Sequence, residues 1–372
     1  MTRHGSVWTT LYEAWATEET SGLATVVRTS GSAPRPVGSA MVLTPRGRVV
    51  GSVSGGCVEG DVLERARAAI LNGIPQEASY GISDDDAFAV GLTCGGTLDV
   101  FVEPVDLDTY PELAKVMDSL RAGSPVAVAT VLAHPRAEAV GAHMVLDAEE
   151  SSGRLLPQDT PAGLLERARS LLRNGESTLL SYDTEGVRVF VHSLTPPPRM
   201  LLFGAGEFAA ALASIGRTMD YRITVCDARP VFTTADRFPD AHQVVVARPA
   251  EYLSQEAADG RVDERTVIVS FSHDPKVDIP LLETALGLDV AYVGALGSRR
   301  THQRRAAALL DAGVSTPAMA RLASPVGLDL GGRSAAETAV SIAAEIIATR
   351  HGGHGARLSD REGPVHVMAT VG

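Results

Sequence analysis

Two cysteines in glycine-rich loops are the residues of this sequence best suited to chemistry. Cys57 follows Ser54-Gly55-Gly56, where a predicted strand passes into a predicted helix. The dipole at a helix N-terminus favours a thiolate, the reactive and metal-binding form of cysteine. Cys94 precedes Gly95-Gly96, which leads into another predicted strand. Glycines allow a bulky ligand to approach the backbone. We therefore interpret both loops as candidate binding loops, with two small buried thiols as the competing interpretation.

The spacing of these thiols does not match a zinc ribbon, because the chain has no C-x-x-C pair. The third cysteine, Cys226, lies within an apolar strand and is assigned to the core. Arg35, upstream of the first thiol loop, is a cation that could contact a phosphate.

A glycine fingerprint in the later half of the chain is a second candidate site. An apolar strand at residues 200–203 is followed by Gly204-x-Gly206-x-x-Ala209 and a helix. Gly204 permits a tight turn, and Gly206 lets a pyrophosphate approach amides at the helix N-terminus. Asp227 ends the next strand, where it could accept hydrogen bonds from a ribose. The pattern predicts the fold. It leaves NAD(P) binding open, because Glu207 places a negative charge beside the phosphate position.

Polar residues also follow two later strands of this region. Ser272-His273-Asp274 comes after the fourth strand, and Gly297-Ser298-Arg299-Arg300 comes after the fifth. The carboxyl ends of parallel strands form the ligand crevice of an open α/β sheet. We interpret these residues as candidate ligand contacts. Helix capping at His273-Asp274 and a solvated helix start at the two arginines are the alternatives.

The elements that must position these residues divide at Thr195-Pro196-Pro197-Pro198, since consecutive prolines form a stiff connector. Residues 1–195 are predicted to form a mixed α+β domain whose topology the pattern does not define. Residues 199–350 alternate strands with helix-length segments, which predicts a Rossmann-like, doubly wound parallel sheet. The fold class is therefore α/β. Residues 351–372 are expected to be a tail.

Composition narrows the classes of function. The chain has 372 residues, of which 45% are hydrophobic and 21% charged, and a net charge of −12. That charge disfavours a general attraction to nucleic acid or to an anionic membrane. No apolar run is long enough to span a bilayer. Three scattered cysteines do not form a disulfide framework, so we expect a reducing, cytoplasmic location.

Taken together, the motifs resemble the XdhC/CoxI family, whose members are accessory proteins of molybdenum hydroxylases such as xanthine dehydrogenase and carbon monoxide dehydrogenase. The matching blocks run from about residue 5 to 350. In the first half they are Ser32-Ala33-Pro34-Arg35, Gly55-Gly56-Cys57-Val58-Glu59, Cys94-Gly95-Gly96 and Val102-Glu103-Pro104. In the second half they are Gly204-Ala205-Gly206, Cys226-Asp227-Ala228-Arg229, Arg237-Phe238-Pro239, His273-Asp274, Gly297-Ser298-Arg299-Arg300 and residues 324–331. Glu207 departs from the pattern, because many members carry histidine there.

The resemblance implies a protein that binds molybdenum cofactor, helps its sulfuration and protection, and delivers it to a hydroxylase apoenzyme. It also implies a cysteine desulfurase as a further partner, and we expect a homodimer. Cys57 and Cys94 become candidate contacts of molybdenum, because sulfur is a soft ligand. The candidate cofactor-binding residues are Arg35, Gly55, Gly56, Cys57, Cys94, Gly95, Gly96, Gly204, Gly206, Asp227, His273, Asp274, Ser298, Arg299 and Arg300.

Two other functions compete with this one. A nicotinamide-dependent oxidoreductase would use the fingerprint domain, with His273 as acid or base near neutral pH. A purely structural scaffold would leave the glycine and arginine loops without a role. The chain lacks an iron–sulfur cysteine pattern, so we do not expect it to catalyse the hydroxylase reaction by itself.

Overall fold

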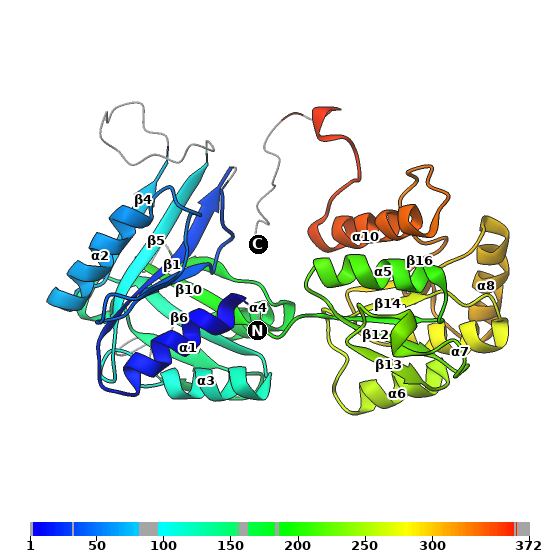
Figure 1. Cartoon of the computed structure of the whole chain (residues 1–372), viewed down its shortest axis with the longest axis horizontal. Helices are drawn as coiled ribbons and strands as arrows, with labels where there is room; N and C mark the ends of the chain where they lie inside the picture. Colours follow the sequence, from blue (N-terminus) through cyan, green and yellow to red (C-terminus); the bar gives the residue numbers. More distant parts are fainter. Residues whose placement is uncertain are drawn as a thin grey trace. The chain divides into compact units, whose positions relative to one another are not determined.

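The structure is a computed structural model that describes residues 3–31, 33–81, 96–153, 155, 163–182, 186–360 and 362. The chain divides into two compact units inside the proline run, the first ending at Pro196 and the second beginning at Pro197 (Figure 1). Each unit has its own sheets and hydrophobic cores.

The first unit contains two antiparallel sheets of five strands each. The first sheet has the order β3-β2-β1-β5-β4, and the second has the order β8-β7-β6-β10-β9. The first five strands are β1 (Ser21–Ser30), β2 (Ala40–Leu43), β3 (Val49–Gly51), β4 (Gln76–Tyr80) and β5 (Thr97–Val105). The next five are β6 (Val126–Ala133), β7 (His143–Leu146), β8 (Ser151–Gly153), β9 (Thr178–Tyr182) and β10 (Val187–Leu194). The helices are α1 (Arg3–Trp15), α2 (Glu59–Asn72), α3 (Leu113–Ala122) and α4 (Leu164–Asn174).

These elements form an internal repeat, because the order helix, three strands, helix, two strands occurs twice. The sequence Leu-Glu-Arg-Ala-Arg recurs at residues 63–67 in α2 and 165–169 in α4. Both helices end in Asn-Gly, and Gly73 and Gly175 adopt the left-handed conformation that closes a helix without the steric cost of a Cβ. The sequence pattern therefore contained the repeat, although no topology was predicted for this domain.

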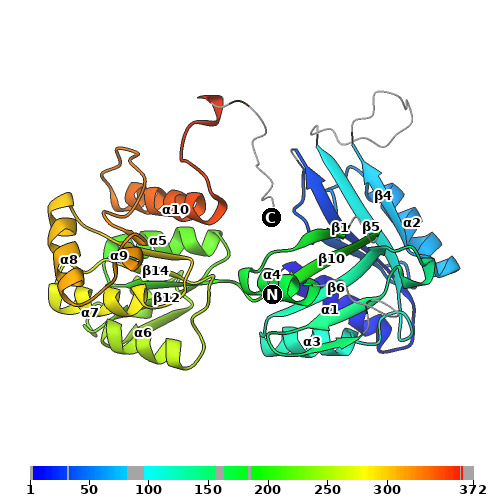
Figure 2. The same cartoon turned by 180° about the vertical axis from the view of Figure 1, so that it is seen from behind.

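The two sheets pack through equivalent positions of the repeat. Val27 and Phe101 of the first sheet form one buried cluster with Leu132 and Phe190 of the second. Thr25 pairs with Phe101 across β1 and β5, and Thr130 pairs with Phe190 across β6 and β10 in the same register. Helix α2 covers the outer face of the first sheet, and α4 packs on the second (Figures 1 and 2).

The second unit is a six-stranded parallel sheet with the order β13-β12-β11-β14-β15-β16. Its strands are β11 (Arg199–Phe203), β12 (Arg222–Asp227), β13 (Gln243–Val246), β14 (Val267–Ser270), β15 (Tyr292–Ala295) and β16 (Leu322–Ala323). Its helices are α5 (Glu207–Thr218), α6 (Pro249–Ala258), α7 (Pro275–Leu286), α8 (Arg299–Asp311), α9 (Thr316–Met319) and α10 (Ala335–His351). Helices α5 and α10 cover one face, while α6, α7 and α8 cover the other.

This arrangement confirms the predicted doubly wound parallel sheet. The strand order reverses between β11 and β14, and such a switch point opens a crevice at the carboxyl ends of the strands. Helix α10 ends at Gly352, and a short 3-10 turn follows at Leu358–Asp360. Residues 363–372 of the predicted tail lie outside the described residues.

Candidate functional sites

The loop between β3 and α2 presents Cys57, which is exposed. Its conformation is organised by Glu59, the first residue of α2. The Glu59 carboxylate accepts hydrogen bonds from Ser52 Oγ (2.6 Å), from the Ser54 and Gly56 amides (2.9 and 2.8 Å), and from Ser54 Oγ. The loop therefore closes around an anion that the chain itself supplies.

Burial opposes the charge on Glu59, but hydrogen bonds from Ser52 and Ser54 outweigh it and lower the pKa to about 2. Gly55 and Gly56 have φ values of 77° and 123°, which side chains rarely tolerate. A Cβ at either glycine would meet no atom of the described residues within 4 Å. Glycine is thus required by the backbone conformation and not by crowding from that part of the chain.

Strand register brings other predicted residues toward the same end of the first sheet. Ser30 at the end of β1 pairs with Thr97 at the start of β5, and Tyr80 at the end of β4 pairs with Leu98. The segment of residues 31–39 leaves the sheet there and carries Arg35, which is half-buried. Gly96 lies directly before β5, whereas Cys94 and Gly95 lie outside the described residues.

Comparison of the two copies of the repeat shows which loop segments occur in the first copy alone. Residues 81–96 join β4 to β5, whereas residues 183–186 suffice to join the equivalent strands β9 and β10. The Ser-Gly-Gly-Cys sequence is likewise absent from the second copy. Both thiol-bearing segments are therefore departures from the repeat and are not needed to build this fold.

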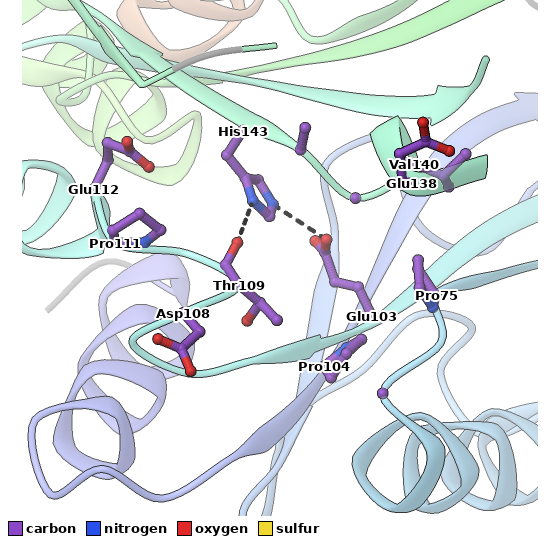
Figure 3. Close-up of a pocket in the computed structure, with 13 residues that line it drawn as sticks. Pro75, Glu103, Pro104, Asp108, Thr109, Pro111, Glu112, Glu138, Val140 and His143 are labelled. Atoms are coloured by element: carbon purple, nitrogen blue, oxygen red, sulfur yellow. Dashed lines mark hydrogen bonds and ion pairs between the residues drawn. The ribbon is translucent and has the colours of Figure 1, made fainter. Parts of the chain in front are cut away.

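A pocket of about 390 Å³ opens elsewhere in the first unit (Figure 3). The His143 ring lies between two acceptors, with Nε2 3.1 Å from Glu103 Oε2 and Nδ1 3.3 Å from the Thr109 carbonyl oxygen. The ring stacks on Tyr110 with centroids 3.9 Å apart. Burial raises the pKa of Tyr110 well above its ordinary value, so the phenol stays neutral.

Sequence reasoning missed His143 and noted Glu103 only within a motif. The sequence feature that could have indicated His143 is a polar residue within an apolar strand. The first copy has Ala40-Met41-Val42-Leu43, and the second copy has His143-Met144-Val145-Leu146 at the same place. The wall of the pocket also carries the carboxylates of Asp108, Glu112 and Glu138 (Figure 3). Among the described residues, no group of three or more His, Cys, Asp or Glu side chains is placed to hold a metal ion.

The crevice of the second unit has a volume of about 500 Å³. Five of the candidate cofactor-binding residues line it, namely Gly204, Gly206, Asp227, His273 and Asp274. Asp274 also caps α7 by accepting a hydrogen bond from the Lys276 amide (3.0 Å). Gly297-Ser298-Arg299-Arg300 is not part of this lining, and Ser298 caps α8 by accepting from the Thr301 amide (3.1 Å).

Asp227 is already engaged within the crevice. It accepts a hydrogen bond from the Ala205 amide (2.8 Å) and a forked pair from Arg229, with Nε at 3.0 Å and Nη2 at 2.7 Å. Burial opposes its charge, but the hydrogen bonds from Arg229 and Ala205 lower the pKa of Asp227 below its usual value. A ribose at this carboxylate would have to compete with Arg229. Glu207, at the start of α5, also lines the crevice.

A buried arginine that sequence reasoning missed ties the loops of this crevice together. Arg305 donates to Asp278 Oδ2 (2.6 Å), Ser324 Oγ (2.8 Å) and the Leu296 carbonyl oxygen (2.9 Å). Asp278 also accepts from Ser270 at the end of β14 (2.7 Å). No pattern distinguishes Arg305 from the exposed arginines of the same helix, because its burial depends on tertiary packing.

Comparisons with known proteins place this geometry in a family. The XdhC and CoxI family model matches residues 14–81 and again 119–183, and these ranges lie within the first and second copies of the repeat. The model of the XdhC Rossmann domain matches residues 200–346. The chain belongs to the XdhC and CoxI family, as its motifs predicted.

Individual relatives are similar over nearly the whole chain. A probable xanthine dehydrogenase subunit of Bacillus subtilis is 30% identical over 90% of this chain and 94% of its own length. The molybdenum cofactor insertion chaperone PaoD of Escherichia coli is 26% identical over 93% of this chain and 89% of its own. A crystal structure described as a xanthine dehydrogenase from Bacillus halodurans covers 94% of this chain and 96% of its own, with 26% identity and a TM-score of 0.66. None of the described helices is long and apolar enough to cross a membrane.

Replacing Glu59 tests the organisation of the Cys57 loop. In Glu59→Ala, the Ser54 and Gly56 amides lose their acceptor, and their hydrogen exchange should speed by roughly tenfold or more, because such bonds contribute about 1.5–3 kcal/mol. Glu64→Ala is the matched control, since Glu64 is an exposed carboxylate of the same helix that pairs with Arg67. Unchanged exchange at both amides in Glu59→Ala would show that another group holds the loop.

The same carboxylate predicts a pH dependence. The pKa of Glu59 is lower in the folded chain than in the unfolded one, so its stabilisation is present above about pH 4.5. That stabilisation should be lost as the pH falls toward 2. The difference in free energy of unfolding between the parent and Glu59→Gln should therefore shrink from pH 7 to pH 3. A constant difference would contradict the lowered pKa.

Glu103→Ala should destabilise the first unit by about 1 to 3 kcal/mol, because the buried Nε2 of His143 loses the carboxylate that it faces at 3.1 Å. Urea unfolding of the full chain, followed by a probe in the first unit, measures the change. Glu138→Ala is the control, because Glu138 lines the same pocket but is exposed. Equal stability of the two variants would mean that the Glu103–His143 pair contributes nothing.

Proposed function

We propose that this protein binds molybdenum cofactor as cargo, helps its sulfuration and protection, and delivers it to the apoenzyme of a xanthine dehydrogenase- or carbon monoxide dehydrogenase-type hydroxylase. The observation that carries the proposal is the similarity to a molybdenum cofactor insertion chaperone across both units. The family to which the chain belongs supports it.

The first unit fits one part of such a cargo. Cys57 offers a soft sulfur donor for a thiophilic metal, and Gly55 and Gly56 allow a bulky ligand to approach the backbone. We propose Cys57 and Cys94 as contacts of molybdenum or of its sulfido ligand. Arg35, Gly95 and Gly96 complete the proposed set in this unit.

The second unit offers a separate candidate site in its crevice. Phe203, Phe208 and Phe271 contribute apolar wall for a flat ring, and a Cβ added to Gly206 would meet no atom of the described residues within 4 Å. Gly204, Gly206, Asp227, His273 and Asp274 are the proposed contacts here. Ser298, Arg299 and Arg300, which are exposed at the start of α8, are proposed as further contacts of the cargo.

We further propose that a cysteine desulfurase supplies sulfur to the bound cargo and that the protein acts as a homodimer. Oxidoreductase activity with NAD(P) has less support. Glu207 opposes a pyrophosphate at the N-terminus of α5.

Co-purification tests the proposal. The protein is produced in cells that make molybdenum cofactor, and bound molybdenum, pterin and nicotinamide are quantified together. We expect near-stoichiometric molybdenum and pterin, falling by about tenfold or more in the Cys57→Ala, Cys94→Ala double variant, because the metal loses its soft ligands. Cys226→Ala, which removes the buried thiol of β12, is the control. Nicotinamide alone would favour the oxidoreductase, and full loading of the double variant would exclude the thiols as ligands.

A further inference from the structure

The turn after β12 displays an aromatic ring flanked by two guanidinium groups. The Arg229 guanidinium carbon lies 4.8 Å from the centroid of the Phe232 ring, and that of Arg237 lies 5.3 Å from the same centroid. Both distances are within the range of cation–π attraction. Phe232 is 41% exposed, and its neighbour Val231 is 80% exposed. The ring therefore has a face that the core does not use.

The backbone of this turn holds the ring in place. The Phe232 amide donates to the Arg229 carbonyl oxygen (3.1 Å), and the Thr233 amide donates to that of Pro230 (3.2 Å). Thr233 is buried, and its hydroxyl donates to the Arg229 carbonyl oxygen as well (2.7 Å). Hydrogen bonds thus fix the backbone from Arg229 to Thr233, which carries the Phe232 ring.

The two arginines differ in how their charge is balanced. Arg229 lines the crevice and forks onto Asp227. Within the described ranges, Arg237 makes no ion pair, and its guanidinium contact is the Phe232 ring. Phe232 and Arg237 lie beside the crevice and outside its lining. Arg229 is balanced by Asp227, so Arg237 supplies the positive charge of this turn that no carboxylate of the described residues pairs with.

The position where this fold usually binds phosphate carries a negative charge here, in contrast to the two arginines after β12. A pyrophosphate normally sits at the N-terminus of the first helix, but α5 begins with Glu207, whose carboxylate lines the crevice. An anionic group is repelled at the α5 end and attracted at the β12 end. The charge pattern thus moves the favoured phosphate position toward Arg229 and Arg237.

We propose that Arg229, Phe232 and Arg237 form the binding site for a phosphate monoester on a ligand that occupies the crevice and extends past Arg229 onto this turn. A guanidinium binds phosphate through paired N–H donors. When Arg229 turns from Asp227 to the phosphate, it releases carboxylate oxygens that accept hydrogen bonds from the ligand. This inference rests on the proposed function for the identity of the ligand, which is then the phosphate end of the pterin cargo. A phosphorylated nucleotide is the other source of the same chemistry.

Titration calorimetry on the full chain, freed of bound ligand, separates the possibilities. The probes are the phosphorylated pterin released from a molybdenum enzyme, the same pterin after phosphatase treatment, NADP⁺ and NAD⁺. We expect the phosphorylated pterin to bind more tightly than the dephosphorylated one. Arg237→Gln should weaken binding of the phosphorylated probe by about tenfold or more and leave the other unchanged. Arg248→Gln is the control, because Arg248 is an exposed arginine paired with Glu251 (3.0 Å).

The outcomes distinguish a failure of the proposed phosphate site from a failure of the proposed cofactor function. Preference for NADP⁺ over NAD⁺ that depends on Arg237, without pterin binding, would support the phosphate site and contradict the cofactor function. Phosphate preference that survives Arg237→Gln would overturn the site while the cofactor function stands. Equal binding of each phosphorylated probe and its partner would overturn the site as well.

Discussion

The exposed position of Cys57 depends on one carboxylate. The Glu59 carboxylate accepts hydrogen bonds from two backbone amides and two hydroxyls of the preceding loop. Without this acceptor, those donors would lack a partner, and the loop would favour another conformation. Gly55 and Gly56 make the conformation sterically accessible, and Glu59 makes it favourable. An internal anion thus takes the place that a bound phosphate has in many glycine-rich loops. The amides of Ser54 and Gly56 are consequently engaged with the protein itself.

The repeat explains how such a loop arises on a stable scaffold. The two copies of one α/β unit contribute residues at equivalent positions to one buried cluster. The second copy lacks both thiol-bearing segments. The first copy can vary its loops because the sheets do not depend on them. The Glu103–His143 pair also arises from a difference between the copies. The second copy has His192 at the position of Glu103, and the first copy has Ala40 at the position of His143. Divergence between the copies has produced both polar sites of the first unit.

The sequence predicted the second unit well because its signals are local. Gly204, Gly206 and Asp227 fall within one strand–helix–strand segment, where the spacing itself dictates the turn and the strand end. The first unit was harder, because β1 pairs with β5 across many intervening residues and no local pattern encodes that pairing. His143 and Arg305 were missed for a related reason: their roles come from partners distant in the chain.

Delivery of the cofactor, the function that we propose, is tested most directly by transfer between purified proteins. The protein loaded with molybdenum cofactor is mixed with the cofactor-free apoenzyme of a xanthine dehydrogenase-type hydroxylase, and hydroxylase activity is followed with time. The account predicts that activity appears in proportion to the loaded protein and exceeds that obtained with the same amount of unbound cofactor. Activation no better than with unbound cofactor, from protein shown to be loaded, would contradict it.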